Sequence, residues 1–387
     1  MLKDLSVTDY ASLGIIHMKK LTDISEIQYG YAFDSKYFTE DSSYPALVRI
    51  RDIKRGYSDT YFSGEYPKEY VLSAGDLLVG MDGEFNIAKW KTDGALLNQR
   101  VCKLVAKGDT NEEYLRFAMT KALKEIENRT SFVTVKHLSA KELNKLELNV
   151  PSSLSQANIA NILSKIETII ELRKEELMNL ENLVKARFAE LFGDPVADSR
   201  GWGQVPLKQM LESIRYGTST PPVFAEDGYC FIRATNIKNG RIVNNDMKHI
   251  SQYEADRLEK CKLAGGEVLI VRSGVNAGDT CVITDEYIGQ YAGYDMILVM
   301  KDEMNPIFLN ELINTGYMNK VVKPLTRRAA QPHLNSEQVQ SFPIIKVPKY
   351  LQDEFADFVK QTNKSKLLEA QQAGFIAKTG QQISFCR

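Results

Sequence analysis

The sequence has few cysteines, and none of them stands at a spacing that binds metal. Five cysteines are scattered over 387 residues, with no C-x-x-C pair and no histidine at zinc spacing. They are Cys102, Cys230, Cys261, Cys281 and Cys386. This pattern argues against a disulfide framework and against a zinc site, so we expect reduced thiols, most of them in the core.

Long hydrophobic runs are also missing. No apolar stretch reaches the length of a transmembrane helix, and the N-terminus lacks the charged-then-apolar pattern of a signal peptide. We therefore expect a cytoplasmic protein that does not associate with membranes. Hydrophobic residues make up 43% of the chain, which is enough for full cores, and the length suggests two or three domains.

The chain has no excess of positive charge. With 49 basic and 50 acidic side chains, its formal net charge is −1. A protein that coats DNA without sequence preference is usually basic overall. If this chain binds nucleic acid, it needs local basic faces and partners that supply further charge.

A heptad pattern runs through the middle of the chain, from about Ser153 to Phe192. Ten positions, separated by alternating steps of four and three residues, carry eight large aliphatic side chains and two arginines. They are Ile159, Leu163, Ile166, Ile170, Arg173, Leu177, Leu180, Val184, Arg187 and Leu191. Such a narrow apolar seam is typical of a coiled coil. Because neither Gly nor Pro interrupts it before Gly193, we expect one helix roughly 60 Å long, which needs a partner helix.

The chain also contains an internal repeat. Gly30 matches Gly217 at an offset of 187 residues, and His137 matches His333 at an offset of 196, a drift that loop insertions explain. The matched stretches are Tyr29–Tyr31 with Tyr216–Thr218, Val48–Gly56 with Ile232–Gly240, Leu72–Val79 with Leu263–Ile270, His137–Ser139 with His333–Asn335, and Gln156 with Gln352. A repeat of this length is a duplicated domain rather than a solenoid unit.

Each copy has short β-type runs, then a short helix, then a long helix that opens near a proline. The expected strands are Ala46–Ile50, Asp76–Gly80, Val101–Val105, Cys230–Ala234, Glu267–Arg272 and Met296–Met300, and the expected short helices are Glu112–Ile126 and Asn305–Met318. We predict a mixed α+β fold, in which two pseudo-repeated globular domains with largely β cores are separated by two long antiparallel coiled-coil helices. The predicted domains are residues 1–150 and 196–347, and the predicted helices are residues 151–195 and 348–387.

These residues resemble the specificity subunits of type I restriction–modification enzymes. The resemblance covers nearly the whole chain and rests on the duplicated domain–helix order together with several motifs. The motifs are Gly75–Phe85 and Leu97–Arg100 in the first copy, Phe188–Pro195 at the end of the central helix, and Gly201-Trp202, Tyr216–Ser219, Gly228–Ile237, Gly266–Gly274 and Gln331–Asn335 in the second. Two stretches depart from the family, because residues 1–18 precede its usual start and Gly374–Arg387 do not continue the second helix in the usual way.

The resemblance implies a non-catalytic subunit that recognises double-stranded DNA. Each globular domain would be a target recognition domain that reads one half of a split sequence, and the helices would fix the separation of the halves. The helices would also dock two modification subunits, which carry S-adenosylmethionine and methylate adenine N6, while restriction subunits add cleavage and translocation. No cofactor is expected in this chain. Because the two copies differ in sequence, the implied target is asymmetric.

Motifs of the corresponding chemistry are missing from the chain itself. It has neither a P-loop nor a nuclease carboxylate–lysine cluster. The adenine methyltransferase motif is Asp or Asn, then Pro-Pro, then an aromatic residue. The tetrapeptide Thr220-Pro221-Pro222-Val223 has neither its first nor its last residue. We therefore do not expect this chain to be an enzyme.

Candidate DNA contacts come from basic clusters and from the repeated motifs, because Arg and Lys suit phosphates and guanine edges whereas Asn and Gln suit adenine edges. The candidates are Tyr29, Arg49, Arg51, Lys54, Arg55, Arg100, Tyr216, Thr218, Ser219, Arg233, Asn236, Arg272, Ser273, Lys323, Arg327, Arg328 and Gln331. The alternative for the charged residues is an ordinary solvated surface, and for the two tyrosines a place in the core. Gly30, Gly75, Gly217, Gly266 and Gly274 are expected in turns with positive φ. The recurring His137 and His333 are expected to cap or pack.

Two other functions are open from the sequence. The chain could be a coiled-coil scaffold whose end domains bind protein or small molecules instead of DNA, which its neutral net charge favours and its basic clusters disfavour. It could also be a solitary specificity protein that serves one fused restriction–modification polypeptide. That protein would share the fold and differ only in its partner.

Overall fold

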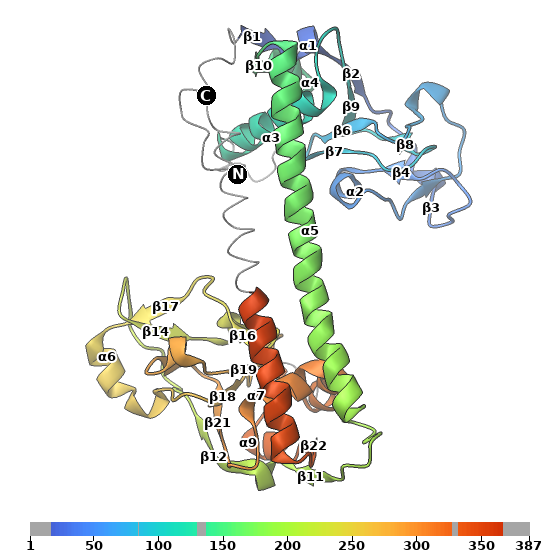
Figure 1. Cartoon of the computed structure of the whole chain (residues 1–387). Helices are drawn as coiled ribbons and strands as arrows, with labels where there is room; N and C mark the ends of the chain where they lie inside the picture. The colour runs from blue at the N-terminus through green and yellow to red at the C-terminus, as the bar shows by residue number, and fades with distance from the viewer. Residues whose placement is uncertain (1–16, 84, 130–136, 327–331, 367–387) are drawn as a thin grey trace. The chain divides into compact units, whose positions relative to one another are not determined.

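The computed structural model describes residues 17–83, 85–129, 137–326 and 332–366. The chain divides into two compact units at the bond between Leu172 and Arg173. This point lies inside α5 (Ser153–Phe192), a single helix of 40 residues (Figure 1). Within the described ranges, no helix is long and apolar enough to cross a membrane.

A four-stranded antiparallel sheet forms the centre of the first unit. Its strand order is β2 (Ser25–Tyr29), β9 (Val101–Ala106), β6 (Leu77–Gly80) and β7 (Ile87–Lys89). Successive residues of β6 point to opposite faces, and both faces are covered. Leu77 and Val79 join a core with helix α3 (Glu112–Arg129), whereas Leu78 joins a second core with Trp90. Burial on both faces explains why these strands read as continuous apolar runs.

The second unit repeats this sheet in the same order. The strands are β12 (Leu211–Tyr216), β21 (Met296–Met300), β18 (Val268–Ile270) and β19 (Thr280–Val282). Val268 and Ile270 pack into the core that contains Phe308, and Leu269 packs into the core on the other face. The fold is therefore the predicted α+β architecture with a duplicated sheet-rich domain.

The other elements of the first unit are short. They are β1 (His17–Lys20), α1 (Leu21–Ile24), η2 (Ser35–Tyr37), β3 (Phe38–Thr39), β4 (Leu47–Val48), α2 (Ile50–Arg55), β5 (Tyr61–Phe62), η3 (Lys68–Tyr70), β8 (Leu96–Leu97), α4 (Ala140–Lys145) and β10 (Glu147–Val150). β1 pairs antiparallel with β10, so the described start and end of the globular part lie side by side.

The second unit is closed in the same way by β11 (Gln204–Pro206), which pairs antiparallel with β22 (Pro343–Ile345). Its remaining elements are η4 (Leu207–Met210), β13 (Phe224–Ala225), β14 (Tyr229–Ile232), η5 (Ala234–Asn236), β15 (Ile237–Lys238), β16 (Arg241–Ile242), β17 (Lys248–Ile250), α6 (Gln252–Arg257), η6 (Glu259–Cys261), η7 (Asp285–Tyr287), β20 (Tyr291–Ala292), α7 (Pro306–Leu312), η8 (Ile313–Val322), α8 (Lys323–Thr326) and α9 (Ser336–Gln340).

The strands expected at Cys230–Ala234 and Glu267–Arg272 end earlier, at Ile232 and Ile270, and two further elements differ more from the prediction. The strand expected at Ala46–Ile50 is only β4, because the Arg49 N–H donates to the Asp52 carboxylate at 3.0 Å and starts α2. The helix expected at Asn305–Met318 is α-helical only as far as Leu312 and then π-helical in η8, where Thr315 leaves helical geometry. The Thr315 hydroxyl instead donates to the Leu312 carbonyl at 2.7 Å.

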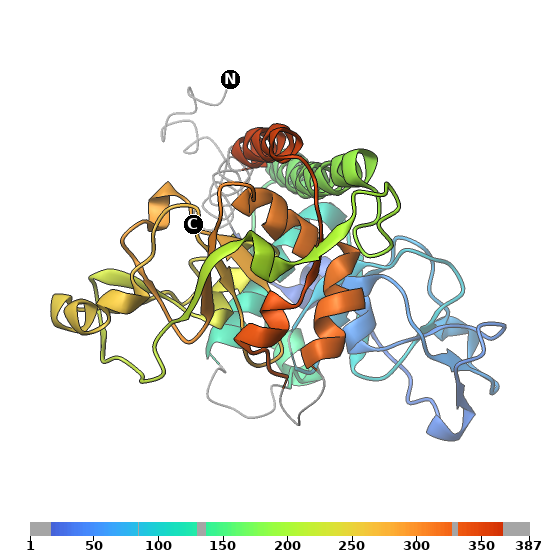
Figure 2. The same ribbon diagram turned by 90° about the horizontal axis from the view of Figure 1, so that it is seen from below.

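The burial of α5 follows the predicted heptad seam. From residue 165 to residue 183, the five seam positions are half-buried and every other position is exposed. A second helix, residues 349–366, runs antiparallel to the last part of α5 within the second unit (Figure 2). The ring of Phe355 lies 5.5 Å from Phe188 and 5.4 Å from Phe192, and Arg187 pairs with Glu354 at 3.3 Å. Residues 367–387 of the expected helix lie outside the described residues.

The same glutamine joins each long helix to its domain. The Gln156 side chain accepts from the Asn111 N–H at 2.9 Å and donates to the Pro151 carbonyl at 2.9 Å. The Gln352 side chain accepts from the Asn305 N–H at 2.8 Å and donates to the Val347 carbonyl at 2.8 Å. Gln156 and Gln352, which match in the sequence repeat, thus attach the two long helices to their domains through equivalent hydrogen bonds.

Candidate nucleic-acid interface

The recurring Tyr-Gly pair marks the same point in both units. The Gly30 N–H donates to the Val101 carbonyl, and the Gly217 N–H donates to the Asp295 carbonyl, each at 2.9 Å. Neither glycine has a positive φ, so our prediction of left-handed turns is wrong for this pair, whereas Gly75, Gly266 and Gly274 do have positive φ. Both positions instead require glycine because the backbone of a neighbouring segment leaves no room for a side chain. A Cβ on Gly30 would lie 2.0 Å from the Asn98 oxygen, and one on Gly217 would lie 1.8 Å from the Gly293 oxygen.

The recurring histidines also occupy matching places. His137 bridges to Asp82, and His333 bridges to Ser273, in antiparallel fashion. The His137 ring hydrogen-bonds the Asp82 carboxylate, and the His333 Nδ1 lies 3.0 Å from the Ser273 hydroxyl. The predicted capping role is wrong, because Ser139 and Asn335 cap α4 and α9.

In the second unit, several candidate residues meet around a cavity. It has a volume of about 290 Å³ and is lined by Ala234, Arg272, Ser273, Tyr294 and Asp295. The Arg272 guanidinium lies over the Tyr216 ring at 4.9 Å. The backbone N–H of Arg272 donates to Asp295 Oδ1 at 3.3 Å. Asp295 is 3% exposed, and burial raises the pKa of its carboxyl to about 6.

Two polar atoms of this cavity lack a partner within the part of the chain that the structure describes. They are the Arg272 Nε and the Asp295 Oδ2, and both are buried. A buried donor and a buried acceptor without partners cost folding free energy, so their persistence is typical of a site that is completed by a ligand or by water.

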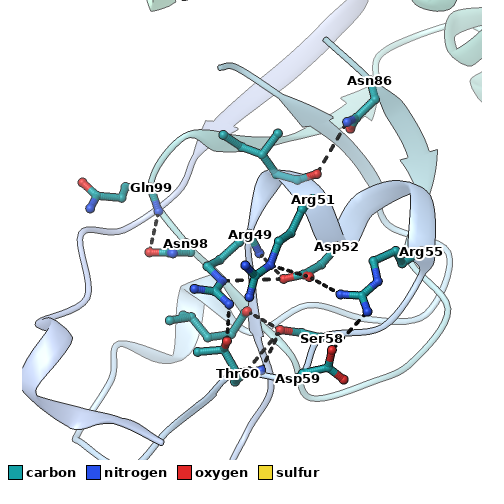
Figure 3. A network of polar contacts seen from close by, with 12 residues as sticks. Arg49, Arg51, Asp52, Arg55, Ser58, Asp59, Thr60, Asn86, Asn98 and Gln99 are labelled. Atoms are coloured by element: carbon teal, nitrogen blue, oxygen red, sulfur yellow. Dashed lines mark hydrogen bonds and ion pairs between the residues drawn. The ribbon is translucent and has the colours of Figure 1, made fainter. Parts of the chain in front are cut away.

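In the first unit, the basic candidates gather on α2. Asp52 is fully buried beneath them, and burial raises the pKa of its carboxyl. Arg51 and Arg55 approach its Oδ1 at 3.7 and 3.6 Å, and Arg49 donates to the Thr60 hydroxyl (Figure 3). Arg51 remains 61% exposed, and Lys54 is also exposed. The side of α2 away from Asp52 therefore presents positive charge to solvent.

A second cluster of the first unit surrounds Arg100, which has a φ of 71°. Its guanidinium lies 3.5 Å from the Asp82 carboxylate and 3.3 Å from the His137 Nδ1. This group occupies the place that Ser273, His333 and Tyr294 hold in the second unit. Asp82 and Ser273 bridge to the two equivalent histidines, and Arg100 and Tyr294 directly precede the residues whose carbonyls accept from Gly30 and Gly217.

Other predicted contacts have partners inside the protein. Arg233 pairs with Asp246 at 2.9 Å, and Lys323 donates to the carbonyls of Ala277 and Val275 at 3.2 and 3.4 Å. The half-buried Tyr29 donates to Asn144 at 3.0 Å within the first unit.

Two further candidates are buried. Asn236 is 0% exposed and donates to the carbonyls of Val243 and Asn245, so it fastens a loop. Thr218 is 8% exposed and bonds the backbone of Thr220. Neither offers its polar atoms to DNA in this conformation, whereas the neighbouring Ser219 is exposed.

Three candidates, Arg327, Arg328 and Gln331, lie outside the described residues. Three residues that the structure brings to the two clusters were not among the predicted contacts: Asp82, Tyr294 and Asp295. Matching Val101–Ala106 with Met296–Met300 would have pointed to the last two, since they directly precede a repeated strand. Among the described residues, no group of three His, Cys, Asp or Glu side chains is placed to hold a metal ion.

Known proteins are similar to this chain in sequence and in fold. Residues 16–182 match the family described as type I restriction modification DNA specificity domain. The chain is 28% identical over 362 residues to the EcoBI specificity subunit of Escherichia coli, a match that covers 83% of this chain and 73% of that protein. It is 20% identical over 302 residues to the MjaVIII specificity subunit of Methanocaldococcus jannaschii, which covers 73% of this chain and 70% of that protein.

Solved structures show the same architecture. The S subunit of a type I restriction–modification system from M. genitalium aligns with a TM-score of 0.60 at 13% identity, covering 96% of this chain and 95% of that chain. A chain from a study of complex assembly and conformational transition of the type I R-M system aligns with a TM-score of 0.53 at 18% identity, covering 95% and 96%. The first half of the chain thus contains a DNA specificity domain, and the fold repeats it. Residues 16–182 belong to the type I restriction modification DNA specificity domain family, and the chain is similar over most of its length to type I specificity subunits.

Proposed function

We propose that each unit reads one half of a split DNA sequence and that the two halves differ. One observation carries this proposal: the two units share a framework but differ in chemistry at one equivalent place. Both have the same sheet order, the same Tyr-Gly contact and the same bridging histidine. At that place the first unit has Asp82 and Arg100, whereas the second has Ser273 and Tyr294. A shared framework with different polar side chains fits two readers of different base sequences.

We further propose that α5 and its partner helix set the spacing of the half-sites and dock modification subunits. Large apolar side chains lie exposed on α5 outside the half-buried seam, among them Ile162 at 44%, Ile169 at 40% and Leu172 at 57% exposed. Exposed apolar side chains in a row are typical of a surface that another protein covers. Two modification subunits are expected there, with restriction subunits joining the assembly.

In this proposal the chain is non-catalytic and holds no cofactor. S-adenosylmethionine would be bound by the modification subunits, which would methylate adenine N6 wherever this chain directs them. The polar clusters described above serve to bind DNA rather than to react with it.

The proposal is tested by sequencing the methylated bases of a host that expresses this chain with its modification subunit. We expect one asymmetric split motif that carries N6-methyladenine, and we expect the motif to disappear when the gene for this chain is deleted. A motif that survives the deletion, or a single uninterrupted motif, contradicts the proposal.

If no motif is found, a gel shift of random-sequence DNA with the chain and its modification subunit separates the remaining possibilities. Binding would indicate a DNA-binding subunit that lacks an active partner. Absence of binding would favour a scaffold whose domains bind protein or small molecules.

A further inference from the structure

The register of the two sheets identifies Arg272 as the counterpart of Met81. The Leu138 N–H donates to the Met81 carbonyl at 2.7 Å, and the Leu334 N–H donates to the Arg272 carbonyl at 2.8 Å. This carbonyl bond is therefore the same in both units, but a buried methionine in one is replaced by an arginine in the other. The shared carbonyl bond does not require an arginine, because Met81 makes it as well. The backbone N–H groups differ, since that of Met81 donates to the Arg100 carbonyl and that of Arg272 donates to the Asp295 carboxylate.

The guanidinium of Arg272 is held in place without being neutralised by a direct ion pair. Tyr216 supports it from one side, with the Tyr216 hydroxyl itself fixed by the Ser336 N–H at 3.0 Å. Among the described residues, no carboxylate lies within ion-pair distance of Arg272, and its Nε has no hydrogen-bond acceptor. The neighbouring Arg215 and Arg233, by contrast, pair with Glu267 at 2.5 Å and Asp246 at 2.9 Å.

The environment of Arg272 favours a neutral acceptor over a phosphate. The carboxylate of Asp295 lines the same cavity, and it ionises as the pH rises through its pKa of about 6. A nearby negative charge weakens the attraction of a phosphate but leaves the directional N–H donors intact. The O6 and N7 atoms of guanine are two neutral acceptors on one edge, and arginine binds them with two parallel hydrogen bonds.

We propose that Arg272 is a specificity-determining residue that reads a guanine in the second half-site, with Tyr216 and Asp295 positioning its guanidinium. This inference rests on the proposed function, because it assigns one base contact to the second reader.

The test uses the full chain in complex with its modification subunit. Duplexes carrying the methylated motif are varied one base at a time in both half-sites, and methylation rates are compared. Arg272→Gln should lower discrimination at one guanine of the second half-site by about 10- to 100-fold and leave every position of the first half-site unchanged. Arg257→Gln is the matched control, because Arg257 is paired with Glu254 on α6 and should change neither half.

Arg272→Lys separates base reading from phosphate binding. It keeps the charge but loses the planar fork, so discrimination should fall while the salt dependence of binding stays the same. Unchanged discrimination in Arg272→Lys, together with a smaller salt dependence in Arg272→Gln, would make Arg272 a phosphate contact and overturn the inference. Equal loss of both half-sites in Arg272→Lys would also overturn it, because the residue would then be structural.

The positioning role of Tyr216 is tested in the same assay. Tyr216→Phe keeps the ring beneath the guanidinium and should retain guanine discrimination, whereas Tyr216→Leu should lose it. If both variants discriminate like the wild type, the positioning role is wrong. A wild-type complex that methylates no split motif would mean that the proposed function fails. A wild-type motif whose second half is unaffected in every Arg272 variant would mean that only this inference fails.

Discussion

At the scale of single residues, the Tyr-Gly pairs show how tightly each sheet end is packed. A side chain on Gly30 or Gly217 would press its Cβ against a backbone carbonyl rather than against a movable side chain. Backbone cannot yield locally, so the strands would have to separate.

We predict that Gly30→Ala and Gly217→Ala each destabilise their own unit by about 1–3 kcal/mol, the usual cost of overpacking. Gly316→Ala is the control, because a Cβ there meets no atom within 4 Å. Each unit has one tryptophan, Trp90 or Trp202, so a Trp→Phe change in the other unit lets fluorescence report urea unfolding of one unit alone. Equal midpoints for Gly217→Ala and Gly316→Ala would contradict the close-approach explanation.

The buried Asp295 makes the stability of the second unit depend on pH. Its folded pKa of about 6 lies above the ordinary 3.8 of an aspartate side chain, so the folded state binds this proton more tightly than the unfolded state does. The resulting stabilisation is complete below about pH 4 and is lost as the pH rises through 6.

Asp295→Asn removes this ionisation and keeps an acceptor for the Arg272 N–H. Relative to the wild type, the variant should gain stability as the pH is raised from 4 to 7.5, by about 3 kcal/mol at most. Urea unfolding followed through Trp202 measures the difference. A stability difference that does not change with pH would show that Asp295 does not titrate in this range.

At the scale of elements, Gln156 and Gln352 anchor the two long helices. They are 3% and 2% exposed, and each satisfies an N–H at the start of the helix that precedes it in its domain. Gln352→Ala leaves that N–H and the Val347 carbonyl without their partner, which should cost about 1–3 kcal/mol. Gln361→Ala, at an exposed position of the same helix, should cost far less. Similar unfolding midpoints for the two variants would contradict the anchoring role.

The length of α5 is the element-scale quantity that should matter for DNA. Inserting four residues after Leu172 lengthens the helix by about 6 Å and should change the half-site spacing or abolish binding, without altering either half-site. A seven-residue insertion keeps the heptad phase and should lengthen the spacer by about three base pairs. Methylome sequencing reads both results. Retention of the original spacing in both variants would show that α5 does not set the spacing of the half-sites.

At the scale of the whole molecule, the net charge of −1 means that DNA affinity depends on where the charges lie. Arg327 and Arg328 lie outside the described residues and are predicted to contact phosphates. Arg327→Ala combined with Arg328→Ala should weaken binding and lower the slope of log affinity against log salt by up to about two.

The matched control for this pair is Arg257→Ala with Lys260→Ala, which removes the same charge from the region of α6. Binding of the complex is measured at several salt concentrations. If both double variants change the slope equally, the effect belongs to overall charge and not to Arg327 and Arg328.

Much of this architecture could be predicted from the sequence because it is set by local pattern and by duplication. The steps of four and three define the seam of α5, and its burial follows those positions. The strand Met296–Met300 was predicted with the bounds that the structure has, since an apolar run buried on both faces is recognisable in the chain itself. The match between Gln156 and Gln352 is evident in the sequence, whereas the hydrogen bonds that these side chains make are evident only in the structure.

The character of the individual polar residues was decided only by the tertiary structure. Arg233 and Arg272 look alike in the sequence, yet one pairs with Asp246 and the other lies over Tyr216 beside an unpaired carboxylate oxygen. Asn236 looks like a base-reading residue and is fully buried. The physical reason is that a side chain bonds to whatever the fold brings near it, and Tyr216, Arg272 and Asp295 come from three separate segments. Periodicity and duplication determine the secondary structure and the domain organisation. Only the packing between distant strands determines which polar groups have a partner inside the protein and which are left to bind a ligand.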